Sequence, residues 1–167
     1  TTGQVMRFVI GPLMGEDTSL PIERVELPEP PALGPSGITR RLALIELDSE
    51  VLPDVGPREA VLGIVSDDGE AIPLDVDDQI TETIVANAVE VWEFHNFTAD
   101  AHPIHVHEVQ FEVVDRQVFD GEPRPPEAWE TGRKDTVIAY PGEITRVNDK
   151  SVQVEIALTV PGCPLKN

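Results

Sequence analysis

Short apolar segments, separated by prolines and glycines, follow one another along most of the chain. The 16 prolines and 12 glycines are spread over the whole sequence, so no helical stretch of useful length remains. Short segments rich in Val, Ile, Leu and Phe and bounded by turn residues are typical of β-strands. After a first apolar piece at 5–10, the pattern predicts strands at 41–47, 60–65, 81–85 and 89–94.

Apolar and polar residues alternate strictly at 105–114 and again at 152–160, which predicts two further strands. Residues 135–140 and 143–147, joined by Pro141-Gly142, are expected to form a hairpin-like pair. Several short strands with turn signals and no fixed repeat predict an all-β fold, an antiparallel Greek-key β-sandwich. An α/β fold is excluded because the sequence contains no helices to connect parallel strands.

A chain of 167 residues has the size of one ordinary domain, and we expect residues 1–167 to form a single one. The proline-rich stretch 20–36 is interpreted as a strap over the surface or an interdomain linker. Because the sequence does not begin with Met, we expect a mature or excised piece. Its first residues lack the layout of a signal peptide, and the cellular compartment stays open.

The charge balance excludes two classes of partner. The chain carries 31 acidic and 12 basic residues, a formal net charge of -19 at pH 7. Such a charge repels nucleic acid phosphates and anionic membranes, so we expect neither as a partner. The single cysteine cannot form an internal disulfide, and it excludes a cysteine-rich zinc module.

The four histidines of the chain all lie between residues 95 and 107. On a strand at 105–114, His105 and His107 would share one face about 7 Å apart, and His102 would approach from the preceding loop. Imidazole is a common ligand of copper, zinc, iron and nickel. The cluster predicts a metal site at His102, His105 and His107, with three exposed histidines and no metal as the alternative. His95 is expected at the surface or at a cap.

Four motifs lie in order along the chain: Glu90-Val91-Trp92-Glu93-Phe94, His102-Pro103-Ile104-His105-Val106-His107, Gly132-Arg133-Lys134-Asp135-Thr136-Val137 and Pro141-Gly142-Glu143. Together they resemble the C-terminal cupredoxin domain of multicopper oxidases, and the similarity extends from residue 1 to about Val147. The group of bilirubin oxidases, spore-coat laccases and phenoxazinone synthases is the most similar branch.

The resemblance implies a cupredoxin-like sandwich that holds copper, with zinc as a possible substitute. In the intact family the reaction is one-electron oxidation of phenolic or pigment substrates with reduction of O2. By position, the resemblance implies that His102 binds the type 1 copper, His105 the type 2 copper and His107 a type 3 copper. It also implies that Asp135 supports the copper centres structurally, an ordinary residue at the start of a strand being the alternative.

The chain departs from the family pattern after about residue 147. The family's closing strand carries His-Cys-His, a further His and an axial Met, whereas this chain has no histidine after His107. Its cysteine, Cys163, lies in Pro161-Gly162-Cys163-Pro164, and we expect 148–167 to form a divergent C-terminal strand, as a truncated or frame-shifted gene would produce. The family's trinuclear copper cluster also requires histidines from an N-terminal domain.

Three functions follow as hypotheses. The first is a copper-binding cupredoxin domain, not a complete oxidase alone, that uses a small-molecule substrate only if a complete copper site is assembled. The second is a mononuclear metal enzyme of cupin-like type, in which Glu112 would have to join His105 and His107. The third is a non-catalytic assembly module. Whether the chain is an enzyme stays open, and we expect a homo-oligomer, a dimer or trimer.

Overall fold

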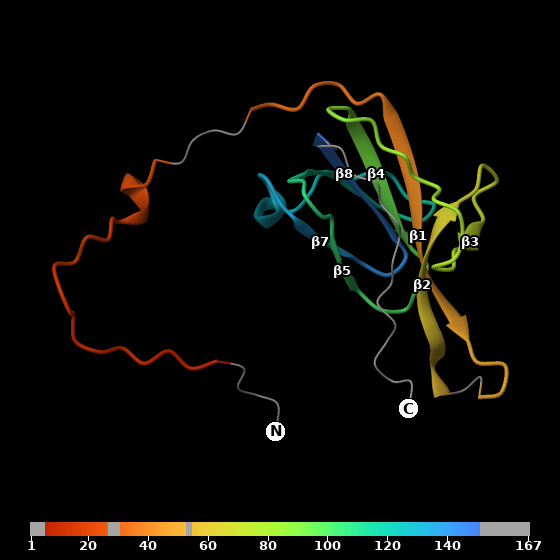
Figure 1. Ribbon diagram of the computed structural model, residues 1–167, viewed down its shortest axis with the longest axis horizontal. Helices are drawn as coiled ribbons and strands as arrows, with labels where there is room; N and C mark the ends of the chain where they lie inside the picture. Colours follow the sequence, from red (N-terminus) through yellow and green to blue (C-terminus); the bar gives the residue numbers. More distant parts are fainter. Residues whose placement is uncertain (1–5, 27–30, 53–54, 151–167) are drawn as a thin grey trace. The chain divides into compact units, whose positions relative to one another are not determined.

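The computed structural model describes residues 6–26, 31–52 and 55–150, with side chains up to residue 148 (Figure 1). The chain divides into two compact units, Thr1–Pro31 and Ala32–Asn167. In the described part of the first unit, the 3-10 helix η1 (Ile22–Arg24) is the only regular element. Residues 6–10 of the apolar piece at 5–10 form no strand, and their side chains are exposed. The strand expected at 152–160 and Cys163 lie outside the described residues.

The described strands of the second unit form two sheets, which confirms the all-β sandwich (Figure 1). In spatial order the six-stranded sheet contains β3 (Ala71–Pro73), β2 (Pro57–Val65), β1 (Ile38–Asp48), β4 (Val89–Asn96), β8 (Glu143–Lys150) and β6 (Glu112–Val118). The two-stranded sheet contains β5 (His102–His105) and β7 (Thr136–Ala139). No helix in the described part of the chain is long and apolar enough to cross a membrane.

One strand pair differs from the antiparallel arrangement that the sequence predicts. β1 and β4 pair in parallel, from Ile38 opposite Glu90 to Leu44 opposite Asn96, whereas the other described strand pairs are antiparallel. The chain leaves β1, forms β2 and β3 on one side of it, and returns through a long connection to place β4 on its other side. A connection of this length allows the parallel orientation, which a tight hairpin turn does not.

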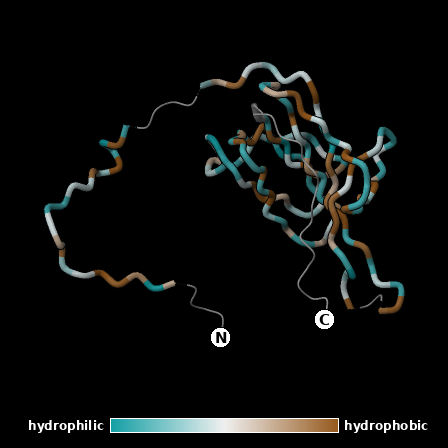
Figure 2. Tube along the Cα trace, in the orientation of Figure 1, coloured by the Kyte–Doolittle hydropathy of each residue, from teal (hydrophilic) through white to brown (hydrophobic). Residues whose placement is uncertain are grey.

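The hydrophobic core lies between the two sheets. Figure 2 shows apolar positions recurring along the strands, and those that face the core come from both sheets. Each large apolar side chain that is buried contributes about 1.5–3 kcal/mol. The core residues are Leu42, Leu44, Ile84, Trp92, Phe94, Val106, Phe111, Val113, Val137, Ala139 and Val147.

The hairpin expected at 135–147 is only half right. A turn does join the two segments, with Gly142 at φ 68° and a hydrogen bond from the Glu143 N–H to the Tyr140 carbonyl. The two strands nevertheless belong to different sheets, because β7 pairs with β5 whereas β8 pairs with β4 and β6. This turn therefore carries the chain from the small sheet to the large one.

The segment 81–85, predicted as a strand, is not one. The buried Ile84 packs into the core, which explains the apolar pattern. Thr83 forms an isolated β-bridge, and Arg40 donates to the Thr83 carbonyl at 2.8 Å and to the Glu82 carboxylate. An apolar residue can thus be buried without a ladder of backbone hydrogen bonds.

The single strand predicted at 105–114 is also wrong. β5 ends at His105, a turn follows at residues 107 and 108, and β6 begins at Glu112. Glu108 adopts φ 64°, a left-handed conformation that interrupts an extended strand. The buried positions accordingly change phase, from Val106 before the turn to Phe111 and Val113 after it.

Candidate metal centre

The structure brings His105 and His107 together at the end of β5. Their ring centroids lie 5.0 Å apart with the planes inclined by 52°, and both side chains are exposed. The two residues do not share one strand, as the sequence predicts, because β5 ends at His105 and His107 lies in the following turn. Two imidazoles with solvent access therefore lie next to each other where β5 ends.

A backbone contact fixes the ring of His105. Its Nδ1 lies 2.7 Å from the carbonyl oxygen of Asp135, which also accepts a hydrogen bond from the Val106 N–H at 3.2 Å. A carbonyl can only accept, so Nδ1 carries the proton and Nε2 keeps the lone pair. The backbone oxygen of Asp135 therefore orients the His105 ring, and the supporting role that the resemblance implies for Asp135 at the copper centres stays a prediction. Nε2 is therefore the ring atom of His105 that could bind a metal ion.

His102 lies on the other face of β5. Burial alternates along this strand, so that His102 and Ile104 are half-buried while Pro103 and His105 are exposed. The His102 Nε2 contacts the hydroxyl of Thr98 at 2.6 Å. Residues three apart along a strand point in opposite directions, so His102 is separated from the other two histidines.

The described residues contain no group of three His, Cys, Asp or Glu side chains placed to hold one metal ion. A single ion bound by His102, His105 and His107 together is therefore not supported, whereas separate ions are compatible with the geometry. The mononuclear alternative also lacks its carboxylate, because Glu112 contacts the guanidinium of Arg133 at 3.2 Å.

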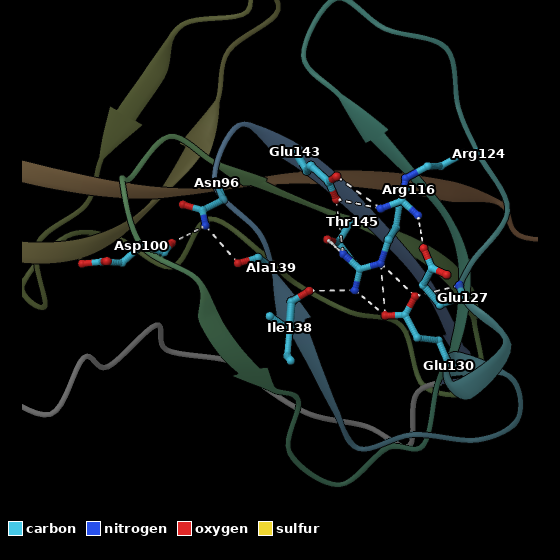
Figure 3. A network of polar contacts seen from close by, with 10 residues as sticks. All are labelled: Asn96, Asp100, Arg116, Arg124, Glu127, Glu130, Ile138, Ala139, Glu143 and Thr145. Carbon is cyan, nitrogen blue, oxygen red and sulfur yellow. Dashed lines mark hydrogen bonds and ion pairs between the residues drawn. The ribbon is translucent and has the colours of Figure 1, made fainter.

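A buried arginine holds the small sheet in place (Figure 3). Arg116 of β6 is fully buried and contacts the Glu130 carboxylate through both Nε and a terminal nitrogen. It also donates to the Ile138 carbonyl of β7 at 2.8 Å and to the Thr145 hydroxyl of β8 at 3.1 Å. β7 is the strand that pairs with β5. By binding β7, Arg116 therefore also holds the position of β5, the strand that carries His102 and His105.

The charge of Arg116 determines the ionisation of Glu130, which is the last residue of the 3-10 helix η3 (Ala128–Glu130). Burial alone would raise the pKa of Glu130, but hydrogen bonds from Arg116 and from the Glu127 N–H outweigh it and lower that pKa. The Tyr140 ring lies 4.8 Å from the guanidinium carbon. The pair is thus a fully ionised contact inside the fold.

His95 is neither at the surface nor a cap, contrary to the prediction. It is 9% exposed, and its ring packs against both Phe97 and Phe119, with centroid distances of 6.2 and 6.4 Å, while those two rings lie 5.0 Å from each other. Its Nε2 lies 3.0 Å from the Glu93 carboxylate. The hydrogen bond with His95 and the contact from Arg146 lower the pKa of Glu93 to about 2, against the opposing effect of burial. His95 is therefore a buried residue of β4 that lies outside the hydrophobic core cluster.

Sequence reasoning missed Asn96 and Thr98, two buried residues that connect β4 with His102. Polar residues spaced in this way are common in turns, where Asn side chains bond the backbone two residues on. That signal was available in Asn96-Phe97-Thr98, but it does not reveal that the turn contacts a histidine.

Comparison with known proteins shows which family this sequence matches. The model of the multicopper oxidase family matches residues 56–153. A laccase from Bacillus stratosphericus is 40% identical over 83 residues, which cover 42% of this chain and 16% of that laccase. A laccase from Haloferax volcanii is 47% identical over 60 residues, or 36% of this chain and 10% of that protein. The chain thus spans a small part of the length of these relatives.

A solved structure supports the fold independently. The multicopper oxidase from Campylobacter jejuni, described as a metallo-oxidase, superimposes with a TM-score of 0.57 at 20% identity, over 78% of this chain and 28% of that one. An identity this low shows the fold alone. Because the family match at 56–153 covers more than half of the sequence, the chain belongs to the multicopper oxidase family.

Proposed function

We propose that this chain provides a copper-binding cupredoxin domain of laccase-like type that is not a complete oxidase by itself. The observation that carries the proposal is the exposed pair of His105 and His107, whose rings lie 5.0 Å apart. His105 is held through Nδ1 by the Asp135 carbonyl, so its Nε2 is oriented outward with a lone pair. Family membership favours copper over zinc, which the same imidazoles could bind.

The donor set fits copper chemically. Neutral imidazole nitrogens are good ligands for Cu(II), and a hydrogen bond from the second ring nitrogen to a carbonyl fixes the tautomer and raises the basicity of the ligand. Bound copper would supply one-electron transfer from a phenolic or pigment substrate towards O2. The role of this chain is to hold His105 and His107 next to each other, and His102 on the opposite face of β5, at separate metal sites.

The proposal is tested by adding Cu(II) to the purified chain and recording the electron paramagnetic resonance spectrum. We expect a nitrogen-rich Cu(II) signal without an intense blue band, because that band requires a cysteine thiolate ligand beside the histidines. The double variant His105→Ala/His107→Ala should lose this signal. His95→Gln is the matched control and should keep it, since His95 is buried away from solvent. Unchanged copper binding in the double variant would refute the assignment, and no uptake by the wild type would favour the assembly module.

We also propose that the chain forms a dimer or trimer. Support comes from apolar side chains next to the β1–β2 hairpin end, where Val51, Leu52 and Val55 are 85%, 57% and 76% exposed. Contiguous exposed apolar surface favours association. The net charge of -19 opposes it, but physiological salt screens charges beyond about 8 Å. Light scattering should give two or three times the 18.3 kDa chain mass, with tighter assembly in salt and copper. An 18.3 kDa particle at high concentration, with and without metal, would contradict this.

A further inference from the structure

Asn96, the last residue of β4, is fully buried and forms two hydrogen bonds with backbone carbonyls (Figure 3). Its Nδ2 donates to the Asp100 carbonyl at 2.8 Å and to the Ala139 carbonyl of β7 at 3.0 Å. Both acceptors require N–H donors, so the orientation of the amide group is fixed. The amide oxygen therefore faces Thr98.

Thr98 is the next member of this chain of contacts, and it is 5% exposed. Both its backbone N–H, at 2.9 Å, and its hydroxyl, at 2.8 Å, contact the Asn96 Oδ1. The same hydroxyl lies 3.0 Å from the Asp100 carbonyl and accepts from the Asp100 N–H at 3.3 Å. The single hydroxyl proton thus already has two acceptors that cannot donate in return.

The third contact of the hydroxyl decides the tautomer of His102. Its Nε2 lies 2.6 Å from the Thr98 Oγ1. Because the hydroxyl proton is directed to Asn96 or Asp100, the proton of this contact must come from the ring. Nε2 therefore donates, and Nδ1 of His102 keeps its lone pair.

We propose that Asn96 and Thr98 are positioning residues that hold His102 in the Nε2–H tautomer and leave Nδ1 as its ligand atom. The ligand role rests on the proposed function, whereas the tautomer is a property of the metal-free chain. His105 has the opposite arrangement, since its Nδ1 is bound by the Asp135 carbonyl. The four-residue strand β5 thus presents two histidines through different ring nitrogens.

The test is long-range 1H–15N NMR of the imidazole rings in the full chain, without metal, at a pH where the histidines are neutral. In the wild type we expect His102 as the Nε2–H tautomer, in at least about tenfold excess, with an Nε2–H proton that exchanges slowly with water. Thr98→Val removes the hydroxyl at nearly the same volume and should abolish the slow exchange, and Thr98→Ser should restore it.

Thr136→Val is the matched control, because Thr136 lies 3.3 Å from the Nδ1 of His105 and not beside His102. It should leave the His102 signals unchanged. An Nδ1–H tautomer of His102 in the wild type would overturn the proposal without any variant, and so would a slowly exchanging Nε2–H that persists in Thr98→Val. Adding Zn(II) afterwards tests metal binding separately, so failure of the proposed function would leave the tautomer result in place.

Discussion

Replacing Glu130 by Gln should lower the free energy of unfolding by about 3 kcal/mol, because the variant leaves a buried cation without its charged partner. Arg116 is fully buried and Glu130 is 2% exposed, so water cannot solvate the guanidinium once its charged partner is removed. The effect falls at the low end of the range for broken buried pairs, since the Glu143 carboxylate still lies 3.5 Å from Arg116.

Urea unfolding at pH 7 measures this change. Glu59→Gln is the matched control, because Glu59 is 56% exposed and its carboxylate lies 3.8 Å from the exposed Arg58. A surface pair of this kind contributes at most about 0.5–1 kcal/mol, so the control should unfold almost as the wild type does. If the Glu130→Gln variant loses less than about 1 kcal/mol, the Arg116 network does not stabilise the fold as its burial indicates.

Replacing Glu93 by Gln should change how stability depends on pH. The pKa of Glu93 lies near 2 in the folded chain, against an ordinary value of 4.5, because His95 and Arg146 bind its ionised form. A lowered pKa in the folded state stabilises the fold above the unfolded value and loses this contribution as the pH falls towards the folded value. At pH 7 the contribution amounts to at most about 3 kcal/mol.

The measurement is the unfolding midpoint of wild type and Glu93→Gln between pH 7 and pH 2. The variant should be less stable at pH 7, and the difference should shrink as the pH falls from 4.5 towards 2. Glu59→Gln should track the wild type over the whole range. A difference between wild type and Glu93→Gln that stays constant with pH would show that packing, and not ionisation, is responsible.

The sequence predicts most strands of the sandwich because their apolar periodicity is local. β1, β2, β4 and β7 overlap the segments that the apolar pattern predicts. The chain also turns at Pro141-Gly142, as proline followed by glycine predicts. Which strands become neighbours is not a local property. The parallel pairing of β1 with β4 and the separation of β7 from β8 depend on the packing of both sheets around one core.

The histidine segment shows the same limit at the level of single residues. Strict alternation at 105–114 is equally consistent with one strand and with two strands joined at a turn. The deciding feature is the left-handed backbone of Glu108, a residue type that rarely adopts it. The partners of Arg116 were also inaccessible to sequence reasoning, because Glu130 and Ile138 lie 14 and 22 residues away along the chain.

The parallel contact between β1 and β4 has a consequence for the order in which the chain can fold. β1, β2 and β3 are joined by short connections and can pair early, whereas Ile38 meets Glu90 only after a long intervening segment has folded back. Closing such a loop costs conformational entropy before any contact compensates for it. We therefore expect this chain to fold in roughly milliseconds to seconds, as other sheets with non-local strand pairs do, and not in microseconds. During that interval the edge of β1 that later receives β4 stays open, with Leu42 and Leu44 beside it. A nascent chain therefore exposes β1 to strand-to-strand aggregation until β4 pairs with it.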